Sequence, residues 1–587
     1  VSGTGRKIPF KTAFLLRRES AAQHTPQEYS KLCGVPLPQI EKIAREFTSH
    51  GTRAAVTAYH GAGNYVNGTF AAYAVAVLNV LIGSVDRKGG YMKGGGGAGA
   101  WDKGDYDLAD FPGIRKPKGV LISREKAVYE KTAEYKKKKE SGGRGYPAKR
   151  PWFGFSAGGL CVEALSGIDE GYPYPCHVLM TYLFNPVYTI PGGNRYIETL
   201  KDPKKVPLFV SLDTAINESN LYADYIVPDL CYPEGHYGWL NPHAPVMKFS
   251  GLRTPMIEPL TGKTEDGRSF STETFLIDLA RQLQLPGFGE GAVKGANDTV
   301  LAIHREEDFY LRAFANIVKN AKVPEASAEE IAWCQQNLPV AKHREILPAD
   351  QWSRLCYALA RGGIFRPYED CFDGEMFKYG LKRAAIYNEQ LASMKNSLTG
   401  KPFPGTPVYL GALDSAGKLI EQEDQEYPFT LVSYKTSLHT QSRSSWHAYT
   451  LELFPENHIL MHVDDAMRLR LKPLDAVRLV SRHNPAGVVG KLQVSRAVKP
   501  GCLAVSFHYG DTQFGASAVE GSNLEKAFLG AETIVKQGKL TAEPRYGTGV
   551  NPNGLGRLDP ALNNTPLVDL AAGIPDFSNT RVKVMKA

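Results

Sequence analysis

Apolar residues follow two different periods along the first part of the chain. Residues 38–47 and 66–82 repeat small and aliphatic side chains at helical spacing, which predicts two helices. Residues 53–59, 177–184 and 206–212 are short apolar runs instead, as is typical of buried strands. Strands that alternate with helix-length segments predict an α/β fold with a doubly wound, mostly parallel sheet. In such a sheet, ligands bind beyond the carboxyl ends of the strands.

A polar or glycine-rich loop follows each of the three apolar runs. Residues 60–63 read His-Gly-Ala-Gly, Asn185-Pro186 follows the second run, and Asp213-Thr214 follows the third. Taken singly, these loops are equally well explained as tight turns and a helix N-cap. Taken together at one sheet edge, they favour a phosphate-rich ligand that carries a guanine or adenine base. Glycine admits a close backbone, a helix N-terminus binds phosphate, and a carboxylate accepts hydrogen bonds from guanine or a ribose hydroxyl.

The middle of the chain is less regular. We interpret residues 89–150 as a long irregular insertion with four consecutive glycines and a solvated lysine run. A fourth apolar piece at 225–228 leads into an aromatic and polar cluster at 234–239. In the mixed region that follows, residues 275–285 have the clearest amphipathic helix pattern.

A β-rich region follows the acidic stretch 421–426. Its short apolar runs, separated by Pro, Gly and Asn turns, predict a separate β-barrel-like domain. These runs are 429–432, 476–481, 488–494 and 502–507. The predicted domains are a dinucleotide-binding α/β domain over 1–233, a mixed α/β domain over 234–425 that completes a discontinuous upstream domain, and the barrel over 426–587.

One loop of this region is dense in hydrogen-bond donors. Residues 435–443 read Lys-Thr-Ser-Leu-His-Thr-Gln-Ser-Arg and directly follow the first β-run. Small hydroxyl groups and one or two cations give a pyrophosphate several hydrogen bonds without bulk. We therefore favour a phosphate-binding loop over a merely solvated one.

Composition narrows the function classes. Lys+Arg 69 and Asp+Glu 61 leave a formal net charge of +8 on 587 residues, and without a clustered basic stripe this argues against nucleic-acid binding. No apolar run reaches the roughly 18 residues that a transmembrane helix needs. The eight cysteines include no C-x-x-C and the fourteen histidines no H-E-x-x-H, so we predict no metal ligands in this chain.

Four segments, taken in chain order, carry a more specific likeness. Residues 78–90 (LNVLIGSVDRKGG) contain a helix end and a glycine loop, and 177–186 (HVLMTYLFNP) a strand that ends in Asn-Pro. Residues 208–235 (LFVSLDTAINESNLYADYIVPDLCYPEG) contain a strand, Asp, Ala-Asp-x-x-Val-Pro and Glu. Residues 457–505 include the pairs Asp465-Ala466 and Pro500-Gly501. This order resembles the molybdopterin oxidoreductases of the dimethyl sulfoxide reductase family, in which Leu is usual at the position of Val227 and the last segment is a C-terminal barrel.

The resemblance implies a six-stranded, double-psi-like C-terminal barrel and one molybdenum ion held by two molybdopterin guanine dinucleotides. It also implies a substrate path to the metal, with Arg443 as a bidentate cation for an oxyanion. The predicted catalytic residues are His236, Trp239 and Arg443. The residues carried over as cofactor-binding are His60, Gly61, Gly63, Asn185, Pro186, Asp213, Thr214, Lys435, Thr436, His439, Thr440, Gln441, Ser442, His508 and Asn551.

Within the family, segments 89–113 and 234–245 resemble the tetrathionate reductases most, which implies reduction of tetrathionate to thiosulfate in anaerobic respiration. Thiosulfate, polysulfide, arsenate or selenate reduction, a non-catalytic cofactor-binding module, and tungsten in place of molybdenum stay open as alternatives. The resemblance further implies an iron-sulfur electron-transfer subunit, a membrane-anchor subunit, and a periplasmic location on the outer face of the membrane.

The family also carries a 4Fe-4S cluster and a protein ligand to the metal, both upstream of the point where this chain begins to align. None of the eight cysteines stands in a corresponding place. We therefore expect the chain to be the C-terminal two-thirds of a larger subunit, with the cluster supplied by an N-terminal segment, and to be inactive alone.

Overall fold

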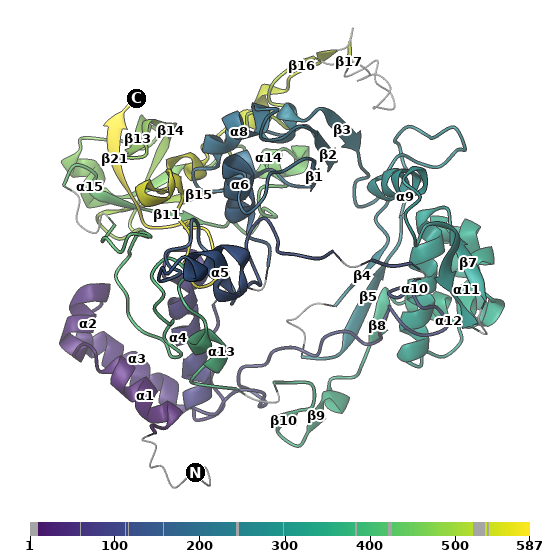
Figure 1. Cartoon of the computed structure of the whole chain (residues 1–587), viewed down its shortest axis with the longest axis horizontal. Helices are drawn as coiled ribbons and strands as arrows, with labels where there is room; N and C mark the ends of the chain where they lie inside the picture. Colours follow the sequence, from purple (N-terminus) through teal and green to yellow (C-terminus); the bar gives the residue numbers. More distant parts are fainter. Residues whose placement is uncertain are drawn as a thin grey trace.

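The computed structural model describes residues 10–58, 60–111, 113–115, 117–156, 158–241, 246–296, 299–381, 384–420, 425–520, 535–536 and 539–587. Figure 1 shows the N-terminal helices at one side, a small sheet and a barrel together, and a helical unit around α10 on the far side of the centre.

Four helices begin the described chain. Thr25 starts the second helix with a capping box, because its hydroxyl accepts from the Glu28 backbone N–H while the Glu28 carboxylate accepts from the Thr25 N–H at 2.7 Å. The helices predicted at 38–47 and 66–82 are confirmed. The four are α1 (Ala13–Ala21), α2 (Pro26–Cys33), α3 (Leu37–Ser49) and α4 (Gly68–Leu81).

The strand predicted at 53–59 is wrong over its described part. Residues 53–58 are extended but belong to no strand, and Tyr59 lies outside the described residues. Asn79 of α4 replaces a neighbouring strand: its side-chain amide donates to Val56 O and accepts from Val56 N–H, each at 2.8 Å. Buried backbone groups need partners, and here one side chain supplies them.

A three-stranded parallel sheet confirms the parallel α/β prediction. Strands β1 (Leu179–Tyr182), β2 (Phe209–Asp213) and β3 (Tyr225–Pro228) lie side by side in that order, with Leu179 opposite Phe209 and Val210 opposite Tyr225. Their carboxyl ends therefore meet at one edge. The helices near them are α6 (Cys161–Glu170), α7 (Pro186–Thr189) and α8 (Ile197–Lys201).

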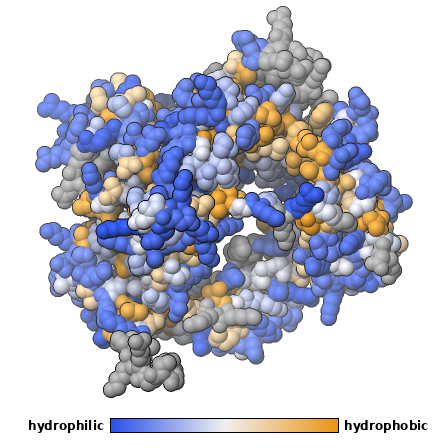
Figure 2. Space-filling model, viewed as in Figure 1, coloured by the Kyte–Doolittle hydropathy of each residue, from blue (hydrophilic) through white to orange (hydrophobic). Residues whose placement is uncertain are grey.

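One face of this sheet carries exposed apolar side chains. Met180, Tyr182, Tyr225 and Ile226 are all exposed in the described structure, and Figure 2 shows hydrophobic side chains gathered over β1–β3. A doubly wound sheet is covered on both faces, so this is a difference from the predicted arrangement within the described residues. Among those residues, no helix has the length and apolar character to cross a membrane.

The insertion at 89–150 is mostly irregular, as predicted, except that the lysine run forms a helix. This is α5 (Ala133–Glu140), capped by the Thr132 hydroxyl and carrying an ion pair between Glu134 and Lys138. Glu134 also accepts from the Lys149 N–H, so part of the run is tied down rather than freely solvated.

A second unit, spanning roughly residues 238–393, packs helices around a dry core. The side chains of Leu311 and Phe314 on α10 and Leu355 on α12 are fully buried there, and the helix predicted at 275–285 is confirmed as α9. Its helices are α9 (Thr272–Gln282), α10 (Glu306–Asn320), α11 (Ala328–Asn337), α12 (Ala349–Leu359) and α13 (Glu389–Ser393). Its strands are β4 (Gly238–Leu240), β5 (Phe249–Arg253), β6 (Gly289–Lys294), β7 (Val300–Ile303), β8 (Gly363–Phe365), β9 (Phe372–Asp373) and β10 (Met376–Phe377).

The C-terminal region is a closed six-stranded barrel, which confirms that prediction. Its strand order is β11-β15-β12-β14-β13-β21, with β11 parallel to β15 and β12 parallel to β14. The four predicted runs became β11, β13, β14 and β15. The barrel strands are β11 (Phe429–Tyr434), β12 (Ile459–His462), β13 (Ala476–Ser481), β14 (Asn484–Ser495), β15 (Cys502–Ser506) and β21 (Thr580–Lys586). Around them lie α14 (Ala448–Leu453), α15 (Val463–Arg468), β16 (Val519–Glu520), β17 (Val535–Lys536), β18 (Lys539–Leu540), β19 (Leu558–Asp559) and β20 (Thr565–Pro566).

Candidate cofactor-binding site

Polar residues follow all three strands at the carboxyl edge of the parallel sheet. Asn185 precedes α7 after β1, Asp213 ends β2, and Asp229 follows β3. The Asp229 N–H donates to Asp213 O at 3.0 Å, so the last two loops touch. The three loops at this edge therefore follow β1, β2 and β3, and the predicted glycine loop at 60–63 is not one of them, because residues 53–58 form no strand of this sheet.

Glu218 joins this edge to the barrel. One carboxylate oxygen accepts from Asn185 Nδ2 at 2.6 Å, and the other accepts from the backbone N–H groups of Thr512 and Gln513 at 2.7 and 2.9 Å. Two sheet loops and a loop after β15 thus converge on one buried carboxylate. We did not select Glu218 from the sequence, although it lies within the segment 208–235 that carries the family resemblance.

Asp213 is a buried acceptor at the end of β2. Its two carboxylate oxygens accept from the Thr214 N–H at 2.8 Å and from Asn217 Nδ2 at 3.0 Å. Burial raises the pKa of Asp213 to about 6; the two backbone hydrogen bonds and the charge of Arg443 oppose this rise, whereas Asp229 adds to it. Arg443 is exposed, yet its charge reaches Asp213, so the structure brings the β2 loop near the predicted phosphate loop.

The loop 435–443 is held by two histidines rather than being loosely solvated. His508 Nδ1 donates to Gln441 O, while its Nε2 accepts from the Thr436 N–H at 3.2 Å. Burial lowers the pKa of His508 to about 4, so the ring is neutral at pH 7 and both contacts persist.

The second histidine closes the same loop from inside. His439 is buried, with Nδ1 3.0 Å from Ser444 Oγ and Nε2 2.5 Å from the Tyr509 hydroxyl. The Thr440 N–H donates to the same serine at 2.9 Å. Lys435 is exposed at the start of the loop, and Ser442 is half-buried near its end.

Four polar atoms around this loop are buried without a hydrogen-bond partner. They are Thr436 Oγ1, Trp446 Nε1, Asp511 Oδ1 and Gln513 Oε1. Such atoms are costly unless a ligand or water satisfies them, and this set contains both donors and acceptors. A large ligand rich in phosphate, sugar and base atoms fits that requirement, so the residues present suit a dinucleotide cofactor.

Close backbone contacts complete this face of the barrel. Gly510 has φ +82°, and a Cβ there would lie 2.5 Å from Asn551 N. Asn551 in turn donates from Nδ2 to Tyr188 O at 3.0 Å, just after Pro186 at the start of α7. Asn551 therefore also joins the barrel to the loop after β1.

The glycine turn lies elsewhere. Residues 61–63 form a 3-10 turn before α4, with the exposed His60 as its N-cap, and a Cβ at Gly68 would lie 1.8 Å from Gly63 O. Gly68 thus allows the start of α4 to pack closely on this turn. The Thr69 hydroxyl donates to Asp569 at 2.7 Å, and Figure 1 shows α4 well away from β1–β3.

His236 and Trp239 lie on the side of the sheet edge that faces the second unit. His236 is buried, and its Nε2 lies 3.4 Å from Asp229 Oδ2. Trp239 stacks on Trp101 with ring centroids 5.2 Å apart and borders the core around α10. Their predicted place on the wall of a substrate path stays a prediction.

The fold and the site define a protein that binds a dinucleotide-type cofactor between a parallel sheet and a barrel. Residues 429–532 match the family model "Molydopterin dinucleotide binding domain", and this range contains all four unpartnered atoms. The chain is 33% identical to a selenate reductase subunit of Mesobacillus selenatarsenatis over 614 residues, and 34% identical to a tetrathionate reductase subunit of Salmonella typhimurium over 573 residues.

These matches cover 99% and 96% of this chain but 55% and 54% of the two relatives, so the chain spans about half the length of the curated relatives it matches. Acetylene hydratase from Pelobacter acetylenicus aligns with a TM-score of 0.55 over 98% of this chain and 66% of that one, at 14% identity, a likeness of fold alone. The chain belongs to the dimethyl sulfoxide reductase family of molybdopterin oxidoreductases and is homologous to their catalytic subunits.

Proposed function

We propose that this chain holds part of a molybdenum ion with two molybdopterin guanine dinucleotides, and forms the catalytic portion of a reductase for an oxidised sulfur compound. The observation that carries the proposal is the set of four buried, unpartnered polar atoms in the segment 429–532. They face loops that Glu218 ties to the sheet edge.

Within this proposal the residues divide by chemistry. Asp213 supplies a carboxylate for a guanine edge or ribose hydroxyl, and Asn185 and Thr214 flank it on the same edge. The hydroxyl and backbone groups of loop 435–443 bind the pyrophosphate. Arg443 attracts the substrate oxyanion or a cofactor phosphate, since a guanidinium binds either in a bidentate manner. The bound metal supplies the two-electron chemistry, and the chain supplies orientation and charge.

Tetrathionate is the proposed substrate; it takes up two electrons at its central S–S bond and leaves as two thiosulfates. Selenate is the second candidate, because a relative named for selenate reduction is 33% identical over almost the whole chain. Since both of these relatives are named as one subunit of a reductase, we also propose an iron-sulfur electron-transfer subunit and a membrane-anchor subunit as partners, at the outer face of the membrane.

The test uses the protein purified in native form from its own host under anaerobic conditions. Oxidation of reduced methyl viologen is followed with tetrathionate, selenate or arsenate as acceptor. We expect a response to tetrathionate that disappears when cells are grown without molybdate. A response to selenate alone transfers the proposal to the second candidate. Tightly bound pterin with no response to any acceptor contradicts the enzyme and supports a non-catalytic cofactor-binding module.

A further inference from the structure

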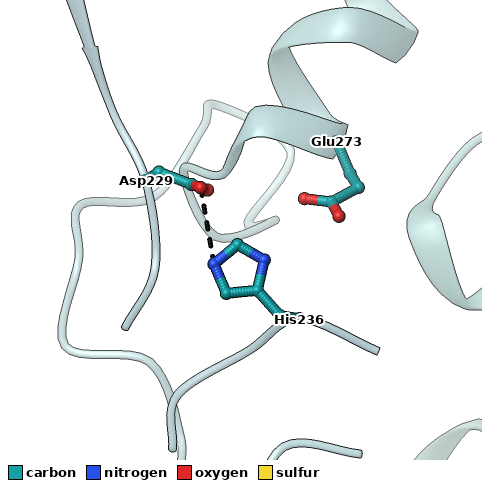
Figure 3. Close-up of side chains that lie close together, drawn as sticks. All are labelled: Asp229, His236 and Glu273. Carbon is teal, nitrogen blue, oxygen red and sulfur yellow. Dashed lines mark ion pairs between the residues drawn. The ribbon is translucent and has the colours of Figure 1, made fainter. Parts of the chain in front are cut away.

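A buried cluster of ionisable side chains lies beside the sheet edge, apart from the barrel loops. It consists of Asp229 after β3, His236 in the loop before β4, and Glu273 in the first turn of α9. One ligand atom from each of the three lies within 4.8 Å of the others. Figure 3 shows both carboxylates directed toward the imidazole from opposite sides.

The carboxylates of this cluster are not satisfied by the protein. The Asp229 side chain is 0% exposed; one oxygen accepts from the Thr272 N–H at 2.9 Å, whereas Oδ2 has no hydrogen-bond partner and faces the cluster. Glu273 accepts from the Tyr310 hydroxyl at 3.3 Å, and its Oε2 is likewise buried without a partner. A third such oxygen, Glu306 Oε2 at the start of α10, lies nearby. Buried like charges without partners are expensive unless a cation or protons compensate them.

His236 is oriented as a ligand would be. Its Nε2 lies 2.6 Å from Leu230 O, and because a carbonyl only accepts, Nε2 carries the proton and donates. The other ring nitrogen, Nδ1, is then a free acceptor, and Figure 3 shows it on the side of the ring toward Glu273. A hydrogen bond from one ring nitrogen to a carbonyl is how metal-ligating histidines are commonly fixed.

We propose that Asp229, His236 and Glu273 bind a divalent first-row cation, Mn²⁺ or Zn²⁺, that fastens the loop after β3 to α9. Two carboxylate oxygens and one imidazole nitrogen suit these ions, and the cluster contains no thiolate that would select a softer metal. Bonds of about 2.1 Å place ligand atoms roughly 3–3.5 Å apart, so small side-chain rotations would close the present spacing. The sequence missed this site because its members lie on three elements and match no local motif.

The proposal is tested on the natively purified protein after treatment with EDTA. Mn²⁺ binding is followed by electron paramagnetic resonance and Zn²⁺ content by mass spectrometry, in wild type, Asp229→Asn and Glu273→Gln. His304→Gln is the matched control, since His304 pairs with Glu290 at 2.9 Å on the exposed surface. We expect one Mn²⁺ site that weakens at least tenfold in both cluster variants and is unchanged in the control.

Thermal unfolding gives an independent readout that needs no activity. Wild type should lose stability in EDTA and regain it with Mn²⁺ or Zn²⁺, whereas Asp229→Asn should be insensitive to both. Asparagine keeps the shape of the side chain and removes one buried charge, so this variant is expected to fold; Glu273→Gln provides a second case. Equal Mn²⁺ stoichiometry in the cluster variants and the control, or a wild-type melting curve that EDTA leaves unchanged, would overturn the proposal in favour of a proton shared between His236 and Asp229.

Discussion

Asp511 is a carboxyl group that its surroundings drive toward the neutral form. It is 2% exposed, and burial raises its pKa to about 8, with the charge of Glu218 adding to the rise and a hydrogen bond from Ser445 opposing it. The unfolded chain releases this proton near pH 4. The folded protein therefore holds one more proton between about pH 4 and pH 8, so this group makes stability fall as pH rises through that window.

Asp511→Asn removes the titration while keeping the shape. We expect the variant to be more stable than wild type by about 2 kcal/mol at pH 8, with the difference shrinking toward zero at pH 4. Urea unfolding across this pH range measures it. Asp464→Asn, at an exposed aspartate, should run parallel to wild type, and a parallel curve for Asp511→Asn would contradict the assigned pKa.

Glu163 is a fully buried carboxylate between two buried arginines. It contacts Arg124 directly and lies 3.4 Å from Arg150 Nη2. Glu163→Gln leaves these guanidinium groups without their shared countercharge, and we expect a loss of about 3–5 kcal/mol. The exposed pair of Glu198 with Lys201 is the control, since Glu198→Gln should change the free energy of unfolding by less than about 0.5 kcal/mol. Equal effects in denaturant unfolding would refute the prediction.

At the scale of elements, the extended segment 53–58 depends on one side chain. Asn79→Ala removes both hydrogen bonds to Val56, and we expect it to cost about 2–3 kcal/mol because two buried backbone groups lose their partners. Hydrogen exchange at the Val56 amide should quicken more than at neighbouring helical amides. Asn67→Ala, at a half-buried asparagine that donates to Leu410 O and Gly411 O, should cost less; unchanged Val56 exchange would contradict this account.

Apolar periodicity predicted the elements whose burial is decided by their own sequence. The helix at 66–82 and the strand at 476–481 were found because one face of each is apolar and buried. The strand at 53–59 was predicted wrongly because an apolar run does not reveal what pairs with its backbone. The helix α5 was missed because its run of lysines has no apolar face; Thr132 and the Glu134–Lys138 pair stabilise it instead.

At the scale of the molecule, sequence order could place loops at one sheet edge but could not choose the residue that joins them to the barrel. Asn185 and Asp213 were predicted because they directly follow strands. Glu218 was not, since the N–H groups that it accepts from lie 294 and 295 residues away. The same holds for Asp229 with Glu273, which only the folded chain brings together.

Glu218→Gln tests this junction. An amide keeps one acceptor but turns an NH₂ group toward Asn185 Nδ2 or the N–H groups of Thr512 and Gln513, which are donors already. We expect faster proteolysis near residue 512 and about tenfold weaker cofactor retention. Glu520→Gln, at an exposed ion pair with Lys539, should match wild type; an intact junction in Glu218→Gln would show that the carboxylate is dispensable.

The most direct measurement is the metal and nucleotide content of the natively purified protein. Acid hydrolysis of two molybdopterin guanine dinucleotides releases two guanosine monophosphates for each molybdenum or tungsten ion. The account predicts one such metal and two nucleotides per chain, with both reduced together in Glu218→Gln. A protein that carries neither metal nor guanosine monophosphate would contradict it.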